Sequence, residues 1–178
     1  MLLDFIATFF ASATALLPIF AADILRVGAE GYGVLFSAAA IGALSMGVLL
    51  SLIHRIPRQG PVLLAAVGLF GLATVVFGLS RSFWLTFGAL AVTGATDMIS
   101  MVVRNTARQL QTPDALRGRM VSLNMIFFQG GPQLGEFEAG AVAGALGAPV
   151  SVVLGGLGSL AATAWIAATT PELRNYSG

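Results

Sequence analysis

The sequence contains no cysteine, which excludes disulfides, thiolate metal sites and cysteine nucleophiles. It also contains no lysine, so all nine of its cationic residues are arginines, opposed by eight acidic residues. A net charge of +1 leaves no broad basic face for nucleic acid. Charged residues make up 10% of the chain, whereas a soluble domain carries about 25%. The chain therefore has too few charges to cover a surface that faces water.

Apolar residues take the place of these charges. They make up 57% of the chain, and the mean hydropathy is +0.89. A bilayer core of about 30 Å needs roughly 20 apolar residues in helical form, and most of the apolar runs are too long for strands. Only helices or closed barrels can span lipid. The sequence predicts an all-α, multi-pass membrane protein whose first partner is the lipid bilayer, with one domain over 1–178 and helices at about 3–22, 32–53, 61–79, 83–110, 116–146 and 149–169.

The arginines predict the orientation of the chain. The first cation is Arg26, so the N-terminus lacks the positive start of a signal peptide, and we expect the first helix to stay in the mature protein. Only Arg26 and Arg81 fall on one side of the predicted membrane. By the positive-inside rule the other side, with both termini, is cytoplasmic; it carries Arg55, Arg58, Arg104, Arg108, Arg117, Arg119 and Arg174.

Ionisable residues inside predicted helices mark where chemistry can occur, because charge in a membrane faces a cavity or a partner. Helices 61–79 and 149–169 have none, and we expect them to face lipid. In helix 83–110, Asp97 lies about 20 Å from the helix start, and Arg104 and Arg108 follow on a similar face. Two interpretations stay open: a carboxylate that takes up a proton or steadies a gate, and a structural salt bridge.

Two further carboxylates lie in helix 116–146, after the segment QGGP (129–132), which weakens a helix. Glu136 and Glu138 are about 200° apart around a helix, so they cannot share one face. Proton or cation coupling, contact with a polar substrate, hydrogen bonding between helices, and an outer position closer to water are all consistent with the pattern. The same helix carries neutral polar groups that are candidates for a cavity lining: Asn124, Gln129 and Gln133.

Other site types have little support. The single histidine, His54, lies in a basic loop without a nearby carboxylate pair, so we expect no metal site and no cofactor. The sequence contains no phosphate-binding loop and no nucleophile–base pair, so we do not expect an enzyme. Small residues one turn apart predict close helix packing; the pairs are Ala38/Gly42, Gly131/Gly135 and Gly140/Gly144.

One segment resembles a known family. Residues 112–124 read TPDALRGRMVSLN, which is similar to the loop between the tenth and eleventh helices of major facilitator superfamily transporters, and more closely to the enterobactin-exporter-like branch. The segments QLGEFEAG (133–140) and GAP (147–149) resemble the same branch. The chain departs from the pattern in FQGGP (128–132), where a serine-asparagine segment is expected, and in the loop 54–60, a degenerate copy of the basic loop motif.

The resemblance implies a fold and a function. Family members have two six-helix halves, and this chain resembles the second, with a 3+3 inverted repeat. The chain would then be a fragment, a truncated product or half of a split transporter, needing an N-terminal half or a second copy. The resemblance further implies proton-coupled efflux of a siderophore or amphipathic drug-like compound across a bacterial cytoplasmic membrane.

The resemblance also suggests roles for residues. Asp97, Glu136 and Glu138 would couple or gate transport. Four arginines would hold the cytoplasmic face: Arg104, Arg108, Arg117 and Arg119. The alternative is a membrane module that does not transport but scaffolds or regulates a partner.

Overall fold

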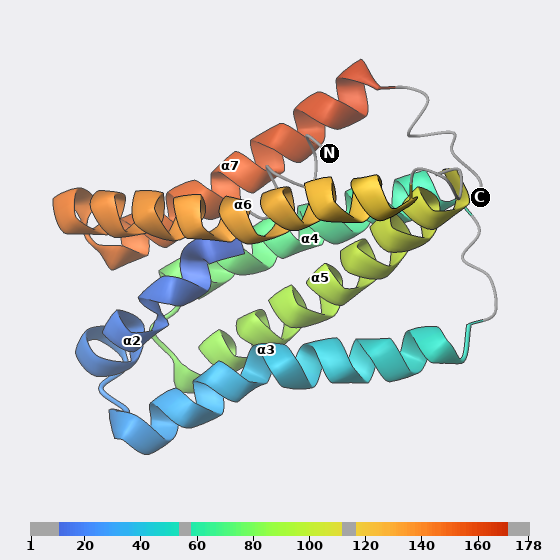
Figure 1. Ribbon diagram of the computed structural model, residues 1–178. Coiled ribbons are helices and arrows are strands. Elements are labelled where there is room, and N and C mark those ends of the chain that lie inside the picture. Colours follow the sequence, from blue (N-terminus) through green and yellow to red (C-terminus); the bar gives the residue numbers. More distant parts are fainter. Residues whose placement is uncertain (1–10, 54–57, 112–116, 171–178) are drawn as a thin grey trace.

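A computed structural model describes residues 11–53, 58–111 and 117–170, and its helices run lengthwise in one bundle (Figure 1). The first segment is built from three short helical pieces: η1 (Ala11–Leu16), α2 (Leu17–Ile19) and η2 (Phe20–Ile24). Long helices follow, namely α3 (Gly28–Ser51), α4 (Gln59–Leu79), α5 (Phe83–Gln111), α6 (Arg117–Leu146) and α7 (Ala148–Thr169).

Four helices in the described part are long and apolar enough to cross a membrane: α3, α4, residues 83–106 of α5, and α7. The chain is therefore a multi-pass membrane protein. The prediction of six spans is supported only in part. In α6, the glutamates, glutamines and glycines lower the hydropathy, and the first segment contributes only a shorter apolar helix, Thr14–Ile24. The single six-helix domain stays a prediction.

The first segment differs from the regular helix expected over 3–22. Residues 3–10 lie outside the described part, and the rest passes from 3-10 to α to π geometry before ending at Ile24. Pro18 stands in the first turn of α2. Because proline has no N–H to donate, it removes one rung of the hydrogen-bond ladder, and the registers on its two sides differ.

One other expectation about local structure is wrong. Residues 28–31, which precede the helix expected over 32–53, form the first turn of α3, where Glu30 is favoured by the helix dipole. The segment 129–132 lies inside one continuous helix that includes Pro132, in agreement with the helix expected over 116–146. Helices in membranes tolerate proline when neighbouring groups satisfy the freed backbone.

The main apolar core lies at one end of the bundle, on the left in Figure 1. The rings of Phe20 and Phe77 are 4.5 Å apart between centroids. Leu35 of α3, Leu90 of α5 and Val152 of α7 belong to the same cluster, and all are almost fully buried. The core thus joins the first segment to each of the long helices, while α3, α5 and α7 diverge toward the other end (Figure 1).

Glycines bring helix backbones into contact at two crossings. A Cβ built on Gly42 of α3 would overlap the carbonyl oxygen of Ala91 in α5, and one on Gly94 of α5 would overlap that of Ala39 in α3. Between α4 and α7, a Cβ on Gly71 would lie 3.0 Å from the carbonyl oxygen of Gly156. The close packing expected at Gly42 is therefore present, whereas Gly140 and Gly144 have open space beside them.

That α4 faces lipid stays a prediction, and the helix carries the exposed Leu69, Leu72 and Leu79. It also packs against both α5 and α7 and is the most buried of the four spans, at 44% of its apolar window. A helix without charges is thus equally suited to protein and to lipid surroundings.

The α6–α7 pair is fixed by a buried hydrogen bond in which the Ser151 hydroxyl donates to the Ala139 carbonyl oxygen at 2.8 Å.

Replacing Gly94 with alanine should destabilise the bundle, because the added methyl group overlaps the Ala39 backbone. Overpacking of this kind costs about 1–3 kcal/mol. Thermal unfolding in detergent, followed by tryptophan fluorescence, should show a lower midpoint for Gly94→Ala.

The matched control is Gly88→Ala in the same helix, where nothing lies within 4 Å of the added carbon. Alanine favours helix formation over glycine, so this variant should match or exceed the parent. An equal loss of stability in both variants would contradict the crossing described here.

Candidate functional site

A carboxylate and a guanidinium group lie together on α5. Arg104 Nη2 is 3.9 Å from Asp97 Oδ1, and the Arg104 side chain is 9% exposed while that of Asp97 is 59% exposed. Arg104 Nε also donates a hydrogen bond to the backbone oxygen of Ser100 at 3.2 Å. The two residues expected to share a helix face therefore form an ion pair. This geometry supports a structural salt bridge without excluding a gating role.

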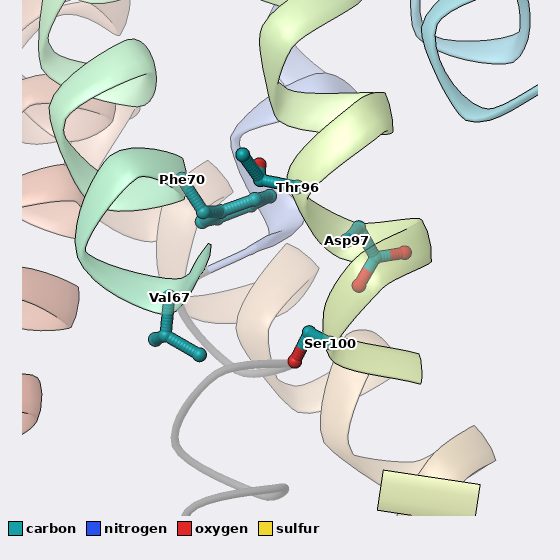
Figure 2. Close-up of a pocket in the computed structure, with 5 residues that line it drawn as sticks. All are labelled: Val67, Phe70, Thr96, Asp97 and Ser100. Atoms are coloured by element: carbon teal, nitrogen blue, oxygen red, sulfur yellow. The ribbon is translucent and has the colours of Figure 1, made fainter. Parts of the chain in front are cut away.

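Asp97 also borders a small crevice between α4 and α5. Figure 2 shows its lining, with Val67 and Phe70 on α4 facing Thr96, Asp97 and Ser100 on α5. Its volume of about 10 Å³ is close to the minimum that one water molecule requires. The Ser100 hydroxyl is buried and has no hydrogen-bond partner among the described residues. A polar group of this kind suits a bound water.

The exposed side of Asp97 does not coincide with the main open face of α5. That face carries Leu85, Gly88 and Val92, which are exposed and follow one line along the helix. Asp97 is about 140° around the helix from Val92. The carboxylate therefore opens on the opposite side of α5.

Glu136 and Glu138 lie on different sides of α6, as their spacing predicts. Glu136 is exposed and Glu138 is half-buried. Glu136 is about 15 Å from the Leu146 end of a 30-residue helix. It shares the open face of α6 with Gln133 and Gly140, which are exposed too. A carboxylate this far inside a helix requires water or a polar partner on that face.

Several predicted site residues cannot be placed by their side chains. Arg108 belongs to α5, and Arg117, Arg119, Asn124 and Gln129 belong to α6, but these side chains lie outside the described part of the chain. His54 lies in the undescribed range 54–57. Within the described residues, no group of three metal-ligating side chains could hold a metal ion.

Sequence reasoning missed the polar neighbours of Asp97. Thr96 and Ser100 are buried and line the crevice, although neither was a candidate. A signal existed: both are small polar residues within four positions of a carboxylate in an apolar helix. Val67 and Phe70 had no such signal, because only the packing of α4 on α5 brings them there.

Comparison with protein families identifies one that matches almost the full length. The family model described as transmembrane secretion effector matches residues 1–176. No solved structure matches the chain.

Curated relatives carry the same name in several strains. The chain is 33% identical over 171 residues to the enterobactin exporter EntS of Escherichia coli O1:K1 / APEC, and the match covers 93% of this chain and 40% of that protein. The same values hold for the exporter of Escherichia coli O45:K1 (strain S88 / ExPEC) and for that of strain O127:H6 (E2348/69 / EPEC). The chain thus spans less than half the length of these relatives. It belongs to the transmembrane secretion effector family of the major facilitator superfamily, and within it resembles the enterobactin exporters.

Proposed function

We propose that this chain is the C-terminal six-helix half of a proton-coupled exporter that moves a siderophore or an amphipathic, drug-like compound out of the bacterial cytoplasm. A second six-helix unit, or a second copy of the chain, completes the transport path. The observation that carries the proposal is Glu136, an exposed carboxylate about two-thirds of the way along α6 in a chain that belongs to a transporter family.

The helix contacts support a 3+3 inverted repeat. If the first segment, α3 and α4 form one triplet, then α5, α6 and α7 form the other. Such a repeat pairs the first segment with α5, α3 with α6, and α4 with α7. The contact of α3 with α5 then corresponds to that of α6 with η1, and the contact of α4 with α5 corresponds to that of α7 with η1. Both pairs of counterparts are present, and α4 packs on α7, as the two third members should.

Burial and position suggest different roles for the carboxylates. Glu136 faces outward with Gln133 on α6, where it can exchange a proton with a water-filled path. Glu138 is half-buried and lies on the opposite side of the helix, so we assign it to contacts between helices. Asp97, held near the buried Arg104, acts as a gating residue at the end of the bundle that we assign to the cytoplasm.

Glu136→Gln should abolish coupling to protons, because glutamine keeps the shape of the side chain but cannot release a proton. The chain would be reconstituted in vesicles with its complementary half, and efflux of an amphipathic dye would be measured under an imposed pH gradient. We expect the gradient-driven rate to fall to that of empty vesicles.

Two matched variants accompany this measurement. Glu138→Gln tests the second carboxylate, and Glu30→Gln changes an exposed glutamate in the first turn of α3. Both should retain gradient-driven efflux. Unchanged coupling in Glu136→Gln would remove Glu136 from this role.

Asp97→Asn should slow transport without uncoupling it, because it weakens the ion pair with Arg104 but leaves Glu136 in place. The pair is partly screened by water on the Asp97 side, so its loss should cost about 1 kcal/mol or less of stability. The checks are the turnover rate and the number of protons moved per dye molecule. Loss of coupling with a normal turnover rate would reverse the roles assigned to Asp97 and Glu136.

The alternative function is a membrane module that scaffolds or regulates a partner without transporting. The exposed Glu136 favours the transporter, since a scaffold has no need of a carboxylate on an open membrane face. The neighbouring reading frame distinguishes the two: a coding region for six further helices favours the transporter.

A further inference from the structure

The last residues of η2 and α4 and the first residues of α5 and α7 lie at the same end of the bundle (Figure 1), and residues of these segments line a second hollow there, away from the Asp97–Arg104 pair. Its volume is about 530 Å³, within the range of small-molecule sites. It forms where four elements end or begin: η2 ends, α4 ends, α5 begins and α7 begins. Its lining consists of Asp23, Ile24, Arg26, Gly78, Leu79, Ser80, Arg81 and Pro149.

The charges around this hollow are unusual for the chain. Arg26 and Arg81 are the two arginines that the sequence places on the outer side, and they are 55 positions apart, yet both line the same hollow. Asp23 is the one acidic residue in the lining, so the hollow has an excess of one positive charge. The fold thus brings together every cation available at this end.

These side chains do not neutralise one another. Among the described residues, Arg104 forms an ion pair with Asp97 within 4.0 Å, whereas neither Arg26 nor Arg81 lies within this distance of the Asp23 carboxylate. Both arginines are exposed, so their donors are available to a ligand. The N-terminal ends of α5 and α7 favour an anion and the C-terminal ends of η2 and α4 oppose it, so the helix dipoles largely offset each other and the arginines decide the sign.

The backbone holds one of these arginines in a special conformation. Arg26 has a φ of 53°, in the left-handed region that residues other than glycine rarely adopt. The segment before it, Phe20–Ile24, has π geometry. Both features are frequent at functional sites. Here they turn the chain between η2 and α3 so that Arg26 borders the hollow.

We propose that this hollow binds a phosphate group, with Arg26 and Arg81 as its ligands. Arginine binds phosphate oxygens through paired donors. The apolar lining from Ile24, Leu79 and Pro149 suits the glycerol region of a phospholipid, so an anionic lipid headgroup is one source of the phosphate, and free phosphate is the other. The site is separate from the carboxylates assigned to transport.

The test uses the purified full chain in detergent. Native mass spectrometry would compare retention of phosphatidylglycerol, which is anionic, with that of phosphatidylcholine, which is neutral. A second arm would titrate inorganic phosphate against chloride at equal ionic strength. The readout would be the fluorescence of Trp84, three residues after Arg81, measured in a Trp165→Phe variant so that no other tryptophan contributes.

The expected result is weaker phosphate binding in the double variant Arg26→Gln/Arg81→Gln, by about fivefold for each arginine removed. The control is Arg58→Gln, an exposed arginine at the opposite end that also has a left-handed φ, of 58°. It should bind like the parent. Preference for phosphatidylglycerol assigns the phosphate to a lipid, and a response to inorganic phosphate alone assigns it to a soluble anion.

The variant Asp23→Asn distinguishes loss of the phosphate site from loss of folding. Removing the opposing carboxylate should strengthen phosphate binding, a gain that a misfolded variant cannot produce. The proposal is overturned if the double variant binds both probes as well as the parent. It is also overturned if Arg58→Gln loses as much affinity, since charge anywhere on the surface would then suffice.

Discussion

Backbone contact at glycines is the interaction on which the bundle depends. In lipid, apolar side chains gain nothing by leaving one hydrocarbon surface for another, so helices associate through close packing. Gly42 and Gly94 bring α3 against α5, and Gly71 and Gly156 bring α4 against α7. The helix α4 then joins the two pairs through its contact with α5. These crossings fix the frame that places Asp97 beside α4 and leaves one face of α6 open.

Polar and apolar residues are distributed unequally between the two ends of the bundle. The large core around Phe20 and Phe77 packs toward one end, whereas a smaller apolar cluster of Leu63, Val67 and Val103 lies near Arg104 at the other. The buried arginine and the crevice therefore occur where apolar packing is thinner. A charged pair costs less there than inside the main core, because the Asp97 side chain is exposed.

The sequence predicted most of the helices, because long apolar runs bounded by charges and prolines are unambiguous in a chain with so few polar residues. It failed where tertiary context decides. Residues 28–31 lie before the expected start of the second helix but form the first turn of α3. The absence of charge in α4 did not indicate its surroundings, since lipid and protein interior are equally apolar. At the site, helical spacing related Asp97 to Arg104, but the crevice requires α4, which no local pattern relates to α5.

The hydrogen bond from Ser151 to Ala139 attaches α6 to α7 at one point along its length. Ala139 lies near one end of the helix, and about 33 Å of α6 extends from it to Arg117. A tilt of about 5° around this point would carry the Arg117 end through an arc of about 3 Å, by the length of the lever. Glu136, only one turn from Ala139, would hardly move. Such a tilt would therefore leave the depth of the carboxylate nearly unchanged.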